Sequence, residues 1–166
     1  MGIRNDPSPA FAEPPSNTLD PVDRIGWRPG PWDAEPSDGA MWTDPATGYA
    51  CAVVRNDFGA WCGYVGVPAG HPWHRADYDA LEVTVHGGLT YGQSARPSRA
   101  AFGRVVDGLF WLGFDCAHWN DLSPGMPTTW REGDRAPPPV YRTEAFARAE
   151  VTALAAQAAA AVEASK

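Results

Sequence analysis

Proline and glycine occur so often in this chain that only one stretch is long enough for an uninterrupted helix. The sequence has 17 residues of each type among 166, a composition that favours strands and loops. Eight of the prolines fall within residues 1–40. Because proline fixes φ and lacks an N–H donor, we predict no regular ladder or helix there. We therefore expect a mobile proline-rich arm over residues 1–26 and one domain over residues 27–166.

The remaining apolar residues group into short runs that are typical of strands. Residues 49–55 and 60–67 flank a turn signal at residues 56–59, which predicts an antiparallel hairpin. Another turn is expected at residues 44–48, where aspartate, proline and glycine cluster. The most apolar run, residues 109–114, predicts a central strand that is buried on both faces.

Apolar and polar residues alternate over residues 81–86. Leu81, Val83 and Val85 would then face the core, as they do in a half-buried strand. Residues 89–91 are expected to extend this strand past a glycine pair at residues 87–88, which could form a bulge.

The C-terminal part holds the one long helix that the sequence predicts, residues 144–163. Thr143 can cap this helix, Glu144 is favourable in its first turn, and its many alanines have the highest helix propensity. We predict an α+β fold: a single domain with a mostly antiparallel sheet of about four to six strands, this helix and the N-terminal arm. The helix either packs on the sheet or meets the same helix of a second chain, which would make a homodimer.

The charge of the chain restricts its partners. Its formal net charge is −7 at pH 7, whereas proteins bind duplex nucleic acid through a basic face, so we expect no such partner. No apolar run approaches the roughly 18 residues of a membrane span, so we expect no membrane partner and a cytoplasmic location. The three cysteines, Cys51, Cys62 and Cys116, contain no CxxC pair, which argues against a disulfide framework and a structural zinc site.

Two segments, residues 85–91 and 113–121, carry most of the residues that are capable of chemistry. Each places a histidine where an apolar run gives way to a loop, and functional sites are often built on loops that a rigid scaffold positions. We therefore expect the functional site here. The spacing leaves open whether the two segments meet in space.

Our first hypothesis is a protein that binds, without catalysis, a small anionic ligand resembling a nucleotide. Paired glycines let the backbone approach a ligand, arginine forks suit phosphate, and aromatic faces suit a base. This hypothesis needs no cofactor. The predicted ligand-binding residues are His86, Gly87, Gly88, Tyr91, Arg96, Arg99, His118 and Trp119.

Other chemistries fit the same two segments. A metal-dependent hydrolase, such as a phosphodiesterase, would hold a divalent cation with His86, Asp115, His118 and Asp121. Cys116 could act as a nucleophile beside a histidine, but it follows an apolar run, and buried cysteines are usually inert. A third hypothesis is an inhibitor that binds a host protein through its acidic surface, exposed tryptophans and proline-rich arm.

Four stretches carry a resemblance. They are WCGYVGVP at residues 61–68 with GHP at residues 70–72, VHGGLTY at residues 85–91, WLGFDCAH at residues 111–118 with Asp121, and Tyr141-Arg142 before the last helix. Through them, residues 27–160 resemble a family of small uncharacterised proteins encoded by bacteriophages and prophages. The resemblance implies a phage-associated setting and a location in the host cell. It also suggests a role against host defences, such as sequestering or hydrolysing a nucleotide signal, but it implies no mechanism.

Overall fold

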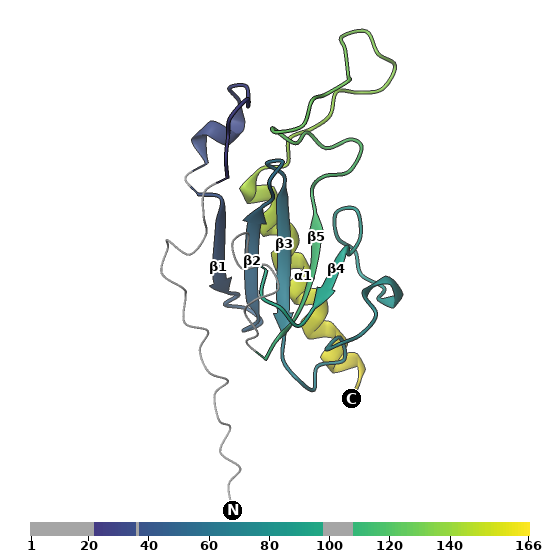
Figure 1. The fold of residues 1–166 in the computed structure, drawn as a ribbon. Coiled ribbons are helices and arrows are strands. Elements are labelled where there is room, and N and C mark those ends of the chain that lie inside the picture. Colours follow the sequence, from purple (N-terminus) through teal and green to yellow (C-terminus); the bar gives the residue numbers. More distant parts are fainter. Residues whose placement is uncertain (1–21, 36, 98–107) are drawn as a thin grey trace, which may run out of the picture.

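Five antiparallel strands form a sheet in the order β1-β2-β3-β5-β4, and the long helix α1 lies across one face of it (Figure 1). The computed structural model describes residues 22–35, 37–97 and 108–166. It confirms the predicted α+β class, with the number of strands in the expected range. The elements are η1 (Pro31–Ala34), β1 (Gly39–Thr43), β2 (Ala50–Arg55), β3 (Trp61–Val67), η2 (Tyr78–Ala80), β4 (Tyr91–Gln93), β5 (Phe110–Asp115) and α1 (Glu144–Ala164).

The predicted hairpin and the predicted central strand are both confirmed. β2 pairs antiparallel with β3, with Ala52 opposite Tyr64. β5 lies between β3 and β4, and its first five residues are buried. The end of β5 is therefore a rigid point, from which the following loop departs.

The prediction of a strand over residues 81–86 is wrong. Side chains of α1 satisfy the backbone of this segment: Gln157 donates to the Thr84 carbonyl and accepts the Thr84 N–H, each at 2.8 Å. The Glu150 carboxylate accepts the His86 N–H at 2.7 Å. The alternation is nevertheless a true burial pattern, because the three apolar residues of the segment pack against the main core. The segment thus runs along α1. The strand that pairs with β5 at this edge of the sheet is β4, which begins later in the chain, at Tyr91.

The edge strand β1 begins inside the stretch where no ladder is predicted. The last proline of that stretch is Pro36, so β1 itself contains none. Its five residues pair with β2, from Gly39 opposite Val54 to the end of the strand. The predicted turn over residues 44–48 then joins the two strands, and its Asp44 carboxylate accepts the N–H of a residue within the turn.

The predicted arm extends too far along the chain. Val22, the first described residue, is buried, and its N–H donates to the Asp38 carboxylate at 2.7 Å. Arg24 pairs with the same carboxylate at 2.7 Å. This end of the predicted arm therefore packs on the domain, while residues 1–21 lie outside the described residues.

A group of four residues around the buried Arg55 ties the chain before β1 to the start of α1; we call it the Arg55 cluster. The guanidinium of Arg55 binds Glu35, Asp38 at 2.8 Å and the Tyr141 hydroxyl at 2.6 Å. Burial alone would raise the pKa of Glu35 and of Asp38, but the hydrogen bonds they receive outweigh it and hold both pKa values below the ordinary range. The cluster fixes Tyr141 and thereby the next residue, Arg142.

α1 begins at the predicted cap and packs on the sheet. The Thr143 hydroxyl oxygen accepts the N–H of Phe146 at 3.2 Å. Val151, Leu154 and three alanines of the helix are fully buried in the main core against β2 and β3. Because successive strand residues face opposite ways, a second apolar cluster around Tyr64 lies on the other face of the sheet.

Within the described part of the chain, no helix combines the length and the apolar character needed to cross a lipid bilayer.

Candidate functional site

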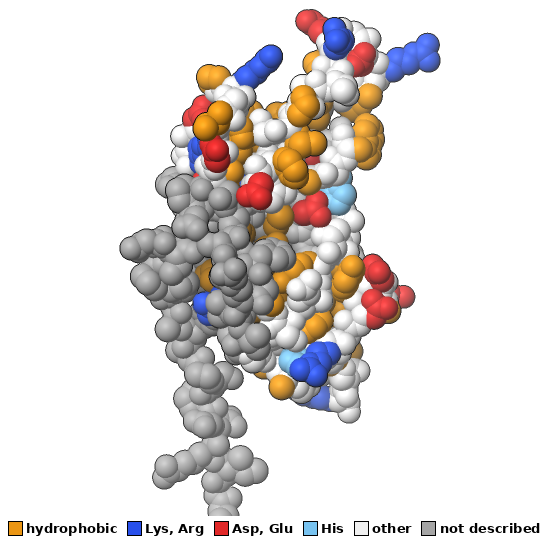
Figure 2. Space-filling model, in the orientation of Figure 1, with side chains coloured by type: hydrophobic (Ala, Val, Ile, Leu, Met, Phe, Trp, Pro, Cys, Tyr) orange, Lys and Arg blue, Asp and Glu red, His pale blue; other side chains and the backbone are white. Residues whose placement is uncertain are grey.

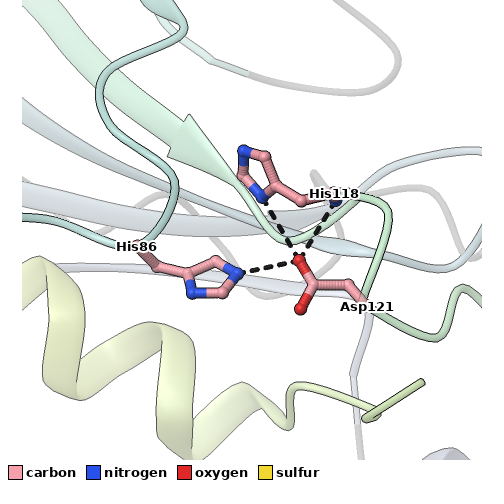
Figure 3. A group of neighbouring side chains, drawn as sticks. All are labelled: His86, His118 and Asp121. Carbon is pink, nitrogen blue, oxygen red and sulfur yellow. Dashed lines mark hydrogen bonds and ion pairs between the residues drawn. The ribbon is translucent and has the colours of Figure 1, made fainter. Parts of the chain in front are cut away.

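The two histidine-bearing loops meet at one carboxylate (Figure 3). His86 Nε2 lies 2.8 Å from Asp121 Oδ2, and His118 Nδ1 lies 3.2 Å from the same oxygen. The backbone N–H of His118 also donates to this oxygen, at 3.1 Å. The two imidazole rings contact each other edge to face, with their centroids 5.1 Å apart. We call these three residues the His–Asp cluster.

Backbone hydrogen bonds hold Asp121 in place after β5. Its N–H donates to the His118 carbonyl at 2.8 Å, and an isolated parallel bridge pairs it with Val140. The Val140 N–H closes this bridge by donating to the Asn120 carbonyl at 2.9 Å. The guanidinium of Arg142, just beyond the bridge, then donates through Nε to Asp121 Oδ1 at 2.9 Å. The two ends of the long loop between β5 and α1 therefore meet at the site.

Gly87 allows the His118 ring to lie against the other loop. The φ of Gly87 is +68°, in the left-handed region that favours glycine. A Cβ at this position would lie 1.9 Å from His118 Cε1 and 2.0 Å from its Nε2. Gly88 also has a positive φ, +85°, but a Cβ there would meet no described atom within 4 Å. At position 87, glycine thus avoids a clash with the His118 ring and allows the positive φ. At position 88, glycine is favoured by the positive φ alone.

The ring of His86 is positioned from the helix. It packs edge to face on Phe146 of α1, with the centroids 5.3 Å apart. Its backbone N–H is held by Glu150 on the next turn of the same helix. One histidine of the cluster is therefore fixed by α1 and the other by the turn after β5.

Asp121 is the buried anchor of the His–Asp cluster. Its side chain is 1% exposed, whereas the side chains of His86 and His118 are 19% and 32% exposed. Burial alone would raise the pKa of Asp121, but hydrogen bonds from His86, Arg142 and the His118 backbone outweigh it and hold the pKa below its ordinary value. Asp121 is therefore an anion at neutral pH, and Arg142 neutralises it.

The cluster offers three ligand atoms for a cation. One nitrogen from each histidine and one oxygen of Asp121 all lie within 4.8 Å of one another, and no other group of three or more such residues in the described ranges does so. Zinc binds imidazole nitrogen and carboxylate oxygen at about 2.0–2.2 Å, so small side-chain movements would let the three atoms share one ion. Two histidines and one carboxylate are a donor set of metal sites that keep positions open.

A hollow of about 210 Å³ opens beside the cluster; we call it the cluster-side hollow. His118 and Asp121 form part of its wall, together with Trp119, Thr128 and Thr129 of the long loop. The loop itself projects beyond the end of the sheet (Figure 1). A small molecule can therefore approach the His–Asp cluster from the side of the loop.

Asp115, which the sequence predicts as a fourth metal ligand, lies outside the His–Asp cluster. Its carboxylate accepts the Thr90 hydroxyl at 2.9 Å and the Ala117 N–H at 3.0 Å. It thereby ties the end of β5 to the chain before β4. The structure thus brings together three of the four predicted metal ligands.

The predicted ligand-binding residues are not gathered at one place. His86, Gly87 and His118 are in contact, and Trp119 lines the hollow beside them. Tyr91 instead packs on the second apolar cluster, on the sheet face opposite α1, where its ring lies against Tyr64.

Three further residues were predicted to bind the ligand: Gly88, Arg96 and Arg99. Gly88 neighbours the His–Asp cluster through the backbone turn that it forms with Gly87. Arg96 is half-buried in the loop after β4, and Arg99 lies outside the described residues. The contact between this arginine loop and the two histidine segments therefore stays a prediction.

Cys116 is buried under the cluster and is not suited to nucleophilic attack. Burial, followed by the nearby charge of Asp121, raises the pKa of its thiol well above the ordinary value. Since the thiolate is the nucleophilic form, a buried thiol of raised pKa is unreactive. This agrees with the prediction that Cys116 is inert.

Sequence patterns did not indicate Arg142 or Glu150 as parts of the site. Arg142 meets Asp121 because the long loop returns to its starting point, and no local spacing reports such a closure. Glu150 lies on the helix face that the segment before Gly87 covers. The one available signal was the position of Arg142 directly before the helix, next to a tyrosine.

Comparisons of this chain with protein-family models, with curated proteins and with solved structures found no match. The case for a function therefore depends on the geometry of the site.

Proposed function

We propose that this chain is a metal-dependent hydrolase of an anionic ester, with a zinc-class ion held by His86, His118 and Asp121. The observation that carries the proposal is the convergence of His86 Nε2 and His118 Nδ1 on one oxygen of Asp121. Arg142 holds the other oxygen, so Asp121 would offer a single oxygen to the ion. Three protein ligands leave a coordination position for water, whose pKa such an ion lowers to about 7.

The charge of the site favours an anionic substrate. Asp121 and Arg142 cancel each other, and imidazoles that bind a metal do so in the neutral form. A bound divalent ion would therefore leave the site positive. The rest of the chain is acidic, with a net charge of −7, and would not attract anions. A phosphoester fits this local charge. In its hydrolysis the water oxygen adds to phosphorus, the P–O bond to the leaving group breaks, and the leaving oxygen takes the proton that water gives up.

The hydrolase accounts for the geometry better than a metal-free binder does. The residues predicted for the binder include Tyr91, which lies on the opposite face of the sheet. Three of the four residues predicted for the hydrolase share one cluster. Degradation of a nucleotide signal would also suit the phage-associated setting that the resemblance implies.

Calorimetric titration of the chelator-treated protein with Zn²⁺ and with Mn²⁺ tests the metal site. We expect one ion per chain for the wild type, and a loss of binding in His118→Ala. His74→Ala is the matched control, because His74 packs near Phe110 and joins no metal-ligand group among the described residues. The metal-loaded wild type and the metal-loaded His74→Ala should hydrolyse bis(p-nitrophenyl) phosphate, whereas His118→Ala should not.

Two outcomes would contradict the proposal. Absence of metal binding by the wild type would remove the metal centre. Metal binding that survives His118→Ala would place the ion elsewhere. If the metal-free protein instead bound a nucleotide through His86 and His118, the sequestering function would replace the hydrolase.

A further inference from the structure

A second hollow of about 200 Å³ lies along the long loop, next to the cluster-side hollow. Both are lined by Trp119, Thr128, Thr129 and Pro139, so they adjoin. The second one is also lined by Trp130, and we call it the Trp130-side hollow. The His–Asp cluster lines the first hollow, and the loop lines the second.

Trp119 stands between the two hollows with its ring in solvent. The residue is 83% exposed, so the fold gains little from burying it. Figure 2 shows apolar side chains along the projecting loop, and Met126 and Val140 are among the exposed ones. Aromatic side chains that remain open beside a site are the usual platforms on which planar rings stack.

The Trp130-side hollow carries polar groups that suit the edge of such a ring. The side-chain oxygen of Asn120, one of its lining residues, is buried and has no hydrogen-bond partner among the described residues. Thr128 and Thr129 add hydroxyls to the wall. Trp130 is held in place by its indole N–H, which donates to the Ala136 carbonyl at 2.9 Å.

Charge distinguishes the two hollows. Asp134 lines the Trp130-side hollow and would repel a phosphate there. The His–Asp cluster, once it holds a divalent ion, would attract one. A ligand with a phosphate at one end and a neutral planar ring with polar edges at the other fits both hollows.

We infer that the substrate class is a nucleoside phosphate ester, with its base stacked on Trp119 and its phosphate at the His–Asp cluster. This inference rests on the proposed function for the phosphate end, whereas the base end depends on Trp119 and the loop alone. Trp119 is then the residue that determines specificity, since it selects for the base without touching the reacting bond.

Calorimetry of the Zn²⁺-loaded protein with AMP and with ribose 5-phosphate tests the inference. The two ligands share the phosphate and the ribose, and they differ in the base. Wild-type protein should bind AMP about tenfold more tightly, in line with stacking of one base on one aromatic side chain. In Trp119→Ala the ratio should fall to about one, with the affinity for ribose 5-phosphate unchanged.

Phe58→Ala is the matched control, because Phe58 is an exposed aromatic residue that lines neither hollow. It should keep the wild-type ratio. Equal affinities of the wild type for the two ligands, or an unchanged ratio in Trp119→Ala, would overturn the inference. Adenosine, titrated into metal-free protein, separates this failure from failure of the metal centre: base binding should persist there even if no ion binds.

Discussion

The Arg55 cluster and the His–Asp cluster are both organised around buried carboxylates, and consecutive residues connect them to α1. Tyr141 belongs to the first cluster, and Arg142 binds the second. In the first, the guanidinium of Arg55 has no exposed surface, and hydrogen bonds to side chains and to a carbonyl occupy it. In the second, the carboxylate is equally buried, but the two imidazoles reach the surface.

This difference in exposure suits a structural role for the Arg55 cluster and the proposed metal-binding role for the His–Asp cluster. A closed set of charges has no atom left for a ligand, and it stabilises the fold when every member has a partner. An open set, anchored on one buried carboxylate, keeps its basic groups in a fixed position within reach of solvent. Tyr141 and Arg142 thus tie the closed cluster and the open one to a common support.

Arg55→Met should have the largest effect on stability. The substitution leaves the Glu35 carboxylate without its buried counter-charge and leaves Asp38 with Arg24 as its remaining cation. We expect the free energy of unfolding to fall by about 3–5 kcal/mol. Arg142→Met should cost about 1–2 kcal/mol, because Arg142 is 25% exposed and Asp121 keeps its other partners. Urea denaturation measures both values. Equal losses would show that the two clusters do not differ in this way.

The Arg55 cluster should also make the protein sensitive to acid. Glu35 and Asp38 have pKa values held below their ordinary values of 4.5 and 3.8, so the unfolded chain binds protons before the folded one does. Stability is therefore present above those ordinary values and is lost as the pH falls through the folded pKa values, at up to about 1.4 kcal/mol per pH unit for each carboxylate.

Urea denaturation at a series of pH values between 6 and 3, taken in steps of about half a unit, measures this slope. Glu35→Gln, which cannot titrate, should show a shallower loss than the wild type. An identical slope in the variant would mean that other carboxylates account for the acid sensitivity.

Sequence patterns predict the parts of the fold in which local signals and burial agree. The hairpin of β2 and β3, the central strand β5 and the cap at Thr143 follow from turn residues, continuous apolar runs and helix propensity. Apolar and polar residues alternate over residues 81–86 as they do in a strand. This alternation indicates which side chains are buried, but it does not indicate which element hydrogen-bonds the backbone. Here the partner is α1, through Gln157, and one chain gives no local sign of that.

The candidate site divides in the same way. Both histidines were found because each follows an apolar run, and Asp121 because of its spacing from His118. Their convergence depends on the sheet order, which places β5 beside β4, and on the bridge at Val140. Contacts between residues that are distant in the sequence produce no repeating pattern in it. The structure was therefore needed to choose between Asp115 and Asp121 as the partner of the histidines.

The two glycines after His86 allow the open cluster to be disturbed at one point. Gly87→Ala would place a Cβ against the His118 ring, whereas Gly88→Ala would meet no described atom within 4 Å. Both variants lose some stability, because both glycines have a positive φ. We expect Gly87→Ala to weaken Zn²⁺ binding about 10- to 100-fold, as changes to the supporting groups of metal ligands do. Calorimetry should show near wild-type affinity in Gly88→Ala, and an equal loss in both variants would exclude ring displacement as the cause.

Asp115→Asn should have the smallest effect, and it distinguishes the carboxylate at the end of β5 from Asp121 in the loop that follows. Asp115 binds Thr90 at an exposed position, so the loss of one charge there should cost about 1 kcal/mol or less. Zn²⁺ affinity should stay at the wild-type value, because the ligand group excludes Asp115, whereas Asp121→Asn should abolish binding. A strong loss of metal affinity in Asp115→Asn would extend the open cluster along β5. Asp115 would then belong to the metal site, although its hydrogen bonds to Thr90 and Ala117 indicate a structural role.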